Sequence, residues 1–338
     1  MPGVPELAAR LGRPVIPLLL PTPYPVGPVW VYLLPDEPVT LVDTGPATPS
    51  AWRSLVAQLA RHGLKPQDIR RVLVTHGHHD HMGLARRLQQ LGAQVYAHPA
   101  DAHNLALRRH YRQLAGMLRS LGLGPGRRLL MMAGLWLLDR TSRPLLHYTP
   151  LAPGDELPAA AGTLGVHHVP GHSPGHVAFE LSRENVWLSG DVLLAGILPN
   201  AVLEADPEQP TRPYPALGVY RKTLKSLAAS PPRALLPAHG PAVTEVQELA
   251  RSTLARQELR SRQIWEALGP TPKTLATLLA RLHPRAKGLG LFLAYSDVYG
   301  HLLDMEEQGL VARVTVGGVH SFARSHAERH GTHRVEAS

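Results

Sequence analysis

The segment His76-Gly77-His78-His79-Asp80-His81 follows the apolar run Val72–Thr75, which we predict to be a strand. It has the pattern H-x-H-x-D-H. The four fixed positions, three histidines and one aspartate, fall within six residues. A pair of divalent metal ions would neutralise and order such a group of side chains. The alternative is a solvated polar turn in a chain with 20 histidines. We disfavour it because other motifs supply further ligands.

Further polar residues follow other strand-like runs along the chain. These runs lead into Asp43-Thr44-Gly45, Pro170-Gly171-His172-Ser173-Pro174-Gly175-His176, Gly190-Asp191 and Ala238-His239. Ligands of open sheets lie beyond the carboxyl ends of the strands, so these turns are expected to meet at one edge. The order of the motifs, more than any single one, predicts a metal site there.

Together these motifs, which span residues 39–240, make the chain resemble the metallo-β-lactamase-fold hydrolases. The resemblance implies the α/β class and an αββα sandwich with a dinuclear site at one edge. Transferred position by position, it implies that a first metal is held by His76, His78 and His172. A second metal would be held by Asp80, His81 and His239, and Asp191 would bridge the two.

The resemblance also bears on polar residues near these ligands. Asp43 is expected to accept a hydrogen bond from a ligand and to fix its orientation. For His176 we favour a structural hydrogen bond over a catalytic role. His79 occupies the variable position of the motif and is not expected to be a ligand. For His167 and His168, which alternate along a strand, we favour no chemical role over one of them pointing at the site.

This ligand set implies hydrolysis by a metal-bridging hydroxide that attacks a carbonyl carbon or a phosphorus. Asp80 and Asp191 are the predicted catalytic carboxylates, since Asp80 could also manage a proton. The mixture of imidazoles and carboxylates suits two zinc ions, and manganese or iron would also fit. The chain has no cysteine, which excludes a cysteine nucleophile.

Length and composition predict two domains, or one domain with an appendage, in 338 residues of which 44% are hydrophobic. Prolines interrupt the first 28 residues, so we expect no signal peptide there. The longest apolar run, residues 129–138, is too short to cross a bilayer as a helix. We therefore expect a cytoplasmic protein that does not associate with membranes.

The net charge of +9 is uneven, because residues 101–150 contain eight arginines and two aspartates. We predict a helical insertion at 101–147 with one helix from Leu105 to Leu118 and another over 127–139. Such an insertion could form a lid in which Arg108, Arg109 and Arg112 guide a polyanion. An ordinary solvated helix surface is about equally compatible with these arginines.

The catalytic domain is expected to cover residues 1–249, and residues 250–325 are predicted to form a winged helix. We expect helices over 251–268, from an N-cap at Thr271 to about His283, and over 292–308, followed by a hairpin with a Gly317-Gly318 turn. Residues 326–338 are predicted to be a disordered tail. Packing on the catalytic domain, or a homodimer contact, is at least as compatible with this segment as nucleic-acid binding.

The order of a catalytic domain and then a winged helix is similar to the lactamase-β-like endoribonucleases, within a branch that also resembles glyoxalase II. The leading hypothesis is therefore a nuclease that acts on RNA or single-stranded DNA. The alternative is a glyoxalase II-like hydrolase of thioesters or lactones. A nucleic-acid-binding protein with a vestigial site is a third hypothesis, which the complete ligand set disfavours. A true β-lactamase is disfavoured because no cysteine ligand is present.

Overall fold

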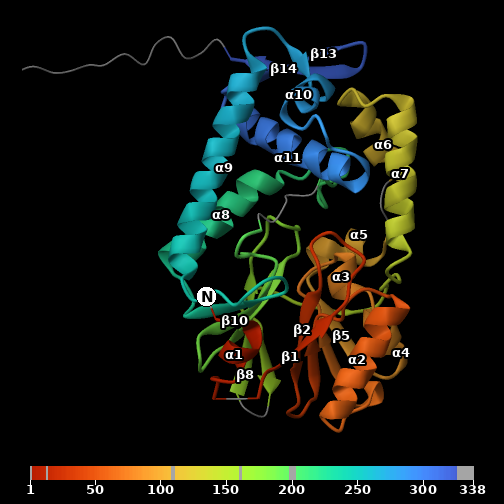
Figure 1. Cartoon of the computed structure of the whole chain (residues 1–338), viewed down its shortest axis with the longest axis vertical. Coiled ribbons are helices and arrows are strands. Elements are labelled where there is room, and N and C mark those ends of the chain that lie inside the picture. The colour runs from red at the N-terminus through yellow and green to blue at the C-terminus, as the bar shows by residue number, and fades with distance from the viewer. Residues whose placement is uncertain (1, 13, 108–110, 160–161, 198–202, 326–338) are drawn as a thin grey trace, which may run out of the picture.

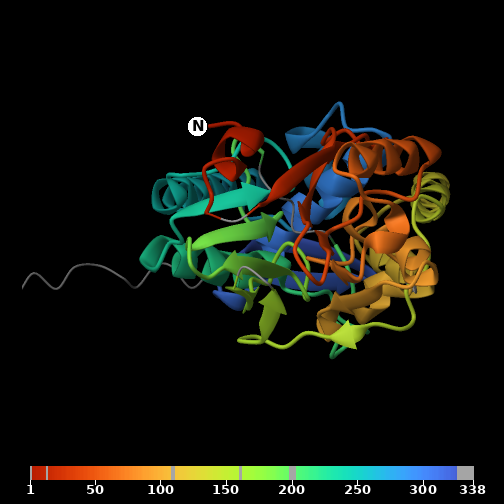
Figure 2. The same cartoon turned by 90° about the horizontal axis from the view of Figure 1, so that it is seen from below.

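The computed structural model describes residues 2–12, 14–107, 111–159, 162–197 and 203–325. Two mixed sheets lie in the lower half of the view in Figure 1, and Figure 2 shows them from below. The first has the order β1-β2-β3-β4-β5-β6, with bounds Ile16–Leu20, Val29–Leu34, Thr40–Val42, Arg71–Leu73, Gln94–Ala97 and Thr149–Pro150. The second has the order β11-β10-β9-β8-β7, whose bounds are Ala234–Pro237, Val186–Gly190, Val177–Leu181, Gly162–His168 and Glu156–Ala159.

The sheets pack face to face through apolar side chains from both. Leu34 and Leu73 of the first sheet share one hydrophobic cluster with Val166, Phe179 and Leu188 of the second. Of the strands that carry these residues, β2, β4, β9 and β10 are mostly buried on both faces, as expected when helices cover the outer sides, whereas β8 is only partly buried. The short helix α1 (Val4–Ala8) joins the same cluster.

Helices cover the outer face of each sheet. On the first sheet, α2 (Pro49–Arg61) and α4 (Ala85–Gln90) pack Leu55, Leu59 and Leu88 against the strands. On the second, α8 (Ala216–Ala229) and the start of α9 (Val246–Leu268) do the same with Leu224 and Val246. The four layers confirm the predicted α/β class, and every strand predicted to precede a ligand is present.

Each large sheet contains a set of parallel strands, and this direction fixes the edge at which their carboxyl ends lie. β3, β4 and β5 are parallel neighbours in the first sheet, and β10 and β11 are parallel neighbours in the second. Their carboxyl ends therefore lie at the same edge of the sandwich, the place where α/β folds bind ligands. Single-turn 3-10 helices at Pro66–Asp68 and Pro99–Asp101 flank β4 and β5.

The insertion differs in part from the prediction. It contains α5 (Ala102–Leu105), α6 (Tyr111–Ser120) and α7 (Pro125–Asp139). The prediction of one continuous helix from Leu105 to Leu118 was wrong, because the chain leaves the helical conformation at Leu107, where φ is 50°. The second predicted helix is confirmed as α7.

The C-terminal region contains, after α9, a short strand β12 (Lys273–Thr274), α10 (Leu275–Leu282), α11 (Gly288–Glu307) and a hairpin of β13 (Val311–Val316) and β14 (Val319–Arg324). The three strands form one sheet in the order β12-β14-β13. The predicted N-cap at Thr271 was wrong: the hydroxyl of Thr274 accepts the cap bond from the backbone N–H of Thr277. The helix α9 runs through the predicted boundary at residue 249.

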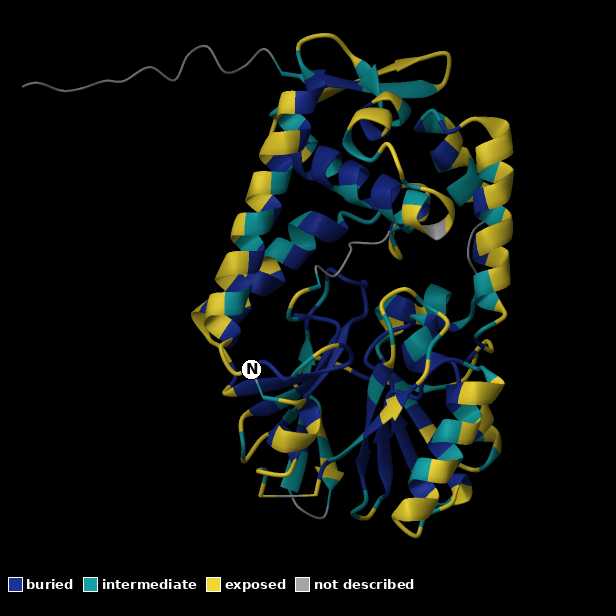
Figure 3. Ribbon diagram, in the orientation of Figure 1, coloured by how far each residue is buried: buried dark blue, intermediate teal, exposed yellow. Residues whose placement is uncertain are grey.

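The C-terminal elements and the insertion share one hydrophobic cluster. Leu118 of α6 and Leu135 of α7 belong to it together with Leu278 of α10 and Tyr299 of α11. Figure 3 shows α11 with buried side chains along most of its length. Within the described residues, no helix is both long enough and apolar enough to span a membrane.

Candidate metal centre

The predicted ligands converge at the edge where the parallel strands end. Each of three groups has ligand atoms that all lie within 4.8 Å of one another: His76 with His78 and His172; His76 with His81 and Asp191; Asp80 with His81 and His239. These groups contain all seven side chains assigned as ligands from the sequence. They come from the loop after β4, the short helix α3 (His79–Met82), and the turns that follow β8, β10 and β11.

Asp191 occupies a central position among the imidazoles. Its Oδ2 lies 3.4 Å from Nε2 of His172, 3.5 Å from Nε2 of His81 and 3.9 Å from Nε2 of His239. Asp80 lies on one side, with its Oδ1 3.6 Å from Nε2 of His81 and its Oδ2 3.4 Å from Nε2 of His239. The distances around Asp191 suit a carboxylate that is shared between two ions.

Several of the candidate ligand atoms are free to bind metal ions, because they make no hydrogen bond to other described groups of the protein. Among the described residues, the buried Nε2 atoms of His81 and His239 and the Oδ1 of Asp191 make no hydrogen bond. Nε2 of His76 and Nδ1 of His78 face each other at 3.0 Å. Buried polar atoms normally have partners, so unsatisfied atoms that converge on one place indicate a missing cation. Imidazole nitrogens with carboxylates are a donor set for zinc, manganese or iron.

Hydrogen bonds on the outer side of the rings orient these nitrogens. Nδ1 of His81 donates to Oδ2 of Asp43 at 2.8 Å, and Nδ1 of His239 donates to the carbonyl of Pro28 at 2.9 Å. Nδ1 of His76 lies 3.1 Å from the hydroxyl of Thr75, which itself donates to Asp43. A ring whose Nδ1 carries the proton presents the Nε2 lone pair to the centre.

Asp43 and His176 hold the surrounding backbone. Asp43 has a left-handed φ of 57° and accepts from the backbone N–H of Thr75 at 2.8 Å as well as from His81. Nε2 of His176 accepts from the backbone N–H of Asp191 at 3.0 Å. Gly190, with φ of 51°, has no room for a side chain, since a Cβ there would lie 2.9 Å from Nε2 of His176. The geometry therefore gives both residues positioning roles.

Burial and neighbouring charges favour the metal-binding protonation states of His76, Asp80 and Asp191, whereas the carboxylates around His81 and His239 raise the pKa of both imidazoles. Burial, reinforced by the surrounding imidazoles, holds the pKa of His76 well below its usual range, so its ring is neutral. Burial would raise the pKa of Asp80, but His81 and His239 outweigh it and lower the pKa to about 2. The pKa of Asp191 is likewise lowered against its burial, chiefly by His81 and His239. Both carboxylates are therefore ionised at neutral pH.

Sequence reasoning missed one residue that supports the centre, Asp101. Its buried carboxylate accepts hydrogen bonds from the backbone N–H of Gly77 at 2.7 Å, the hydroxyl of Ser173 at 2.8 Å and the backbone N–H of Gly175 at 2.7 Å. It therefore joins two loops that carry ligands. Burial, with a contribution from Glu204, raises its pKa to about 6. Asp101 lies shortly after β5, and this position after a strand was the available signal.

Three neighbouring histidines lie outside the cluster and have other partners. Nε2 of His79 lies 2.9 Å from Oδ1 of Asp139 at the end of α7. Nε2 of His167 lies 2.6 Å from Glu180, and Nε2 of His168 donates to the carbonyl of Pro174 at 2.8 Å.

Of the arginines proposed for substrate binding, only Arg112 is among the described residues, and it does not belong to the cluster. Arg112 is exposed on α6. Arg108 and Arg109 lie outside the described residues.

An αββα sandwich with these seven side chains at one edge is the architecture of a metal-dependent hydrolase. Residues 24–239 match the Metallo-beta-lactamase superfamily, and the chain belongs to that family. It is 31% identical over 307 residues to the probable metallo-hydrolase YqjP of Bacillus subtilis, covering 87% of this chain and 93% of the relative.

Two further relatives extend the comparison. The crystal structure of the metallo-beta-lactamase family protein TTHA1429 from Thermus thermophilus superimposes with a TM-score of 0.79 at 28% identity, covering 92% of this chain and 98% of that one. The atrochrysone carboxyl ACP thioesterase AacuM of Aspergillus aculeatus is 30% identical over 128 residues, which is 38% of this chain and 37% of the relative. The first likeness includes the insertion and most of the C-terminal region, whereas the second is local.

Proposed function

We propose that the protein is a two-metal hydrolase that cleaves a thioester or ester bond beside an apolar acyl group. The observation that carries this choice is the apolar surface of α7, the helix of the insertion whose last residue contacts the segment with the metal-ligand candidates. α7 ends at Asp139, which holds His79 of the ligand loop. Two large apolar side chains near that end of the helix, Trp136 and Leu137, are exposed. Such a helix suits a hydrocarbon chain better than a polyphosphate.

The C-terminal region gives the nuclease hypothesis little support. The helix that would read nucleic acid in a winged helix is α11, and such a helix needs a free face to enter a groove. In α11, side chains such as Phe292, Val298 and Leu302 are buried in the shared cluster. Its Asp304 forms an ion pair with Arg221 of α8. We therefore assign this region a packing role against the catalytic sandwich and the insertion.

The family comparison supports the same bond type. The Aspergillus relative is, by its name, a thioesterase for an acyl group on a carrier protein. Its similarity covers only part of each chain, so we transfer the thioester bond and not the particular acyl group or carrier.

The ligand cluster accounts for the chemistry that this proposal needs. His76, His78 and His172 would hold one divalent ion, Asp80, His81 and His239 would hold the other, and Asp191 would contact both. When bound, two such ions would supply a water acidified toward neutral pH and polarise the carbonyl oxygen. A carboxylate with a pKa of about 2 is a weak base, which favours the ligand role of Asp80 over proton transfer.

A substrate panel tests the proposal. Purified protein is loaded with zinc or with manganese and incubated with decanoyl-CoA, acetyl-CoA and labelled single-stranded RNA and DNA, with EDTA and the Asp191→Asn variant as controls. We expect metal-dependent hydrolysis of decanoyl-CoA that exceeds that of acetyl-CoA and falls at least a hundredfold in the variant. Metal-dependent cleavage of RNA or DNA without thioester hydrolysis would instead establish the nuclease.

A further inference from the structure

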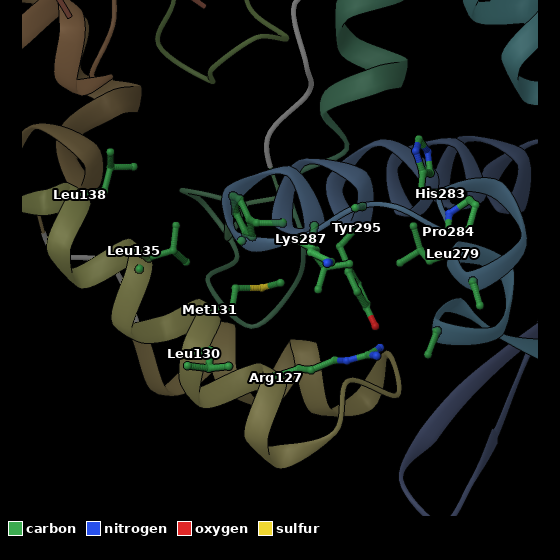
Figure 4. A pocket seen from close by; sticks show the side chains of 17 residues that line it. Arg127, Leu130, Met131, Leu135, Leu138, Leu279, His283, Pro284, Lys287 and Tyr295 are labelled. Carbon is green, nitrogen blue, oxygen red and sulfur yellow. The ribbon is translucent and has the colours of Figure 1, made fainter. Parts of the chain in front are cut away.

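A cavity apart from the metal-ligand candidates lies between the insertion and the C-terminal region. It is lined by α7, α10 and the start of α11 (Figure 4). Its volume of about 770 Å³ is within the range of small-molecule sites. Most of its lining is hydrocarbon, contributed by side chains that include Leu130, Met131, Leu135, Leu138, Leu279 and Phe292. None of the metal-ligand candidates lines it.

The charged groups of this cavity are all basic. Arg127, His283 and Lys287 line it, and no described residue of the lining is acidic. Within the described part of the chain, neither Arg127 nor Lys287 forms a salt bridge. The guanidinium of Arg127 and the hydroxyl of Tyr295 point toward each other in Figure 4. Arg127, Lys287 and Tyr295 could bind an anion together, whereas His283 is already in contact with Arg260 and Asp297.

The apolar and basic parts of the lining are separated along α7. Arg127 lies in the first turn of the helix, whereas Leu135 and Leu138 lie near its other end. Figure 4 shows Leu135 and Leu138 on the side of the cavity away from His283. The cavity is thus long, with a basic end and a hydrocarbon end, which is the shape and polarity of an amphiphile.

We propose that this cavity binds an amphiphilic anion, a fatty carboxylate of medium to long chain. Its head would contact Arg127, Tyr295 and Lys287, and its tail would lie along α7 toward Leu138. The site is distinct from the metal centre. A fatty carboxylate is also the acid that the proposed hydrolysis would release, but binding here does not rest on that reaction.

The first test measures displacement of a fluorescent probe, dansyl-undecanoate, from the metal-loaded full-length protein. We expect displacement by dodecanoate and by dodecyl phosphate, and at least tenfold weaker displacement by dodecyltrimethylammonium, because the basic end repels a cation. Arg127→Gln should weaken dodecanoate about tenfold. Arg128→Gln is the matched control, since Arg128 neighbours Arg127 but does not line the cavity. Equal affinity for both head charges, or no effect of Arg127→Gln, would overturn the assignment of the basic end.

The second test fills the cavity. Gly134 lines it, and a Cβ built there meets nothing within 4 Å, so Gly134→Phe adds a side chain without a backbone clash. Gly116 of α6 is equally open but lies outside the lining, and Gly116→Phe is its control. We expect at least tenfold weaker binding in Gly134→Phe alone.

The same titration in Asp191→Asn separates this proposal from the proposed function. Retained binding there supports a site apart from the metal centre, whatever bond the enzyme cleaves. Binding that is lost in Asp191→Asn and retained in Gly134→Phe would place the probe at the metals and overturn the proposal.

Discussion

At the scale of single residues, the metal centre depends on groups that never touch a metal. Asp43 holds His81, and Asp101 holds the backbone of the two loops that carry His76 and His172. Such partners fix the direction of ligand atoms, and their loss typically weakens metal binding 10–100-fold.

Asp101→Asn tests this dependence. An amide has only one acceptor oxygen, so its NH₂ group would face one of the two N–H donors that the carboxylate now accepts from, Gly77 or Gly175. We expect zinc affinity to fall about 10–100-fold in a competition titration with a chelating dye. Asp155→Asn is the control, because the carboxylate of Asp155 accepts, among the described residues, a single hydrogen bond, from the backbone N–H of Ala152. Unchanged affinity in Asp101→Asn would show that the loops hold their positions without it.

The ligands were predictable from the sequence and Asp101 was missed for a physical reason. The ligands occur in dense motifs directly after strands, where a few consecutive residues carry the signal. Asp101 stands alone, and its partners lie 24, 72 and 74 residues away in two other loops. Only the folded arrangement shows that a buried carboxylate is needed between them.

At the scale of elements, α11 is a buried helix held by polar contacts to its neighbours. Arg221 of α8 donates to Asp304 of α11 and, at 2.9 Å, to Ser261 of α9. These side chains are largely shielded from water, with exposures of 14% for Arg221 and 9% for Asp304. The polar network thus joins the C-terminal helices to the layer that covers the second sheet.

Replacing Arg221 with methionine would leave the carboxylate of Asp304 without its cation. Breaking a buried ion pair from one side costs about 3–5 kcal/mol, so we expect a loss of that order in the free energy of unfolding, measured in urea. Arg262→Met is the control, because Arg262 and its partner Glu258 are 72% and 57% exposed, and it should cost less than about 1 kcal/mol. Equal effects of the two substitutions would contradict the role given to the Arg221 contact.

The same interface should make stability depend on pH through His301. Burial, opposed by Asp297, lowers the pKa of this histidine to about 4, against about 6.5 when unfolded. Between these values the unfolded chain binds more protons, so stability falls as pH is lowered from 6.5 toward 4. The contribution lost between pH 7.5 and pH 5 is about 2 kcal/mol.

His301→Gln removes the titrating group and can keep the hydrogen bond to Ser261. Urea unfolding at pH 7.5 and pH 5 should therefore show a smaller loss for the variant than for the unsubstituted protein, by about 2 kcal/mol. An identical loss in both proteins would mean that His301 titrates normally.

The positions of helices and strands were predicted better than the interruptions within helices and the packing of the helices. Strand and helix positions followed from apolar runs and Gly or Pro breaks, and errors arose where a turn interrupts a helical pattern, as at Leu107. The sequence of α11 also indicated that this helix is buried, although the winged-helix prediction treated it as a recognition helix. A helix with apolar residues nearly all round, as in 291–305, is typically enclosed by other elements.

At the scale of the whole molecule, the insertion connects two parts of the structure. Its apolar side chains complete the cluster of the C-terminal helices, and its last helical residue, Asp139, contacts the loop that carries the metal ligands. In Figure 1, α7 runs along one side of the molecule from the level of the C-terminal elements to the sandwich. We expect the C-terminal region to support the catalytic centre by holding this helix in place.

We propose that seven side chains form a two-metal site that hydrolyses acyl thioesters. The most direct measurement removes all metal with a chelator and then adds zinc or manganese stepwise while decanoyl-CoA hydrolysis is followed. We expect no activity without metal and a rise that saturates at two ions per chain, with Asp191→Asn inactive throughout. Full hydrolysis in the metal-free protein, or saturation without any decanoyl-CoA hydrolysis, would contradict the proposal.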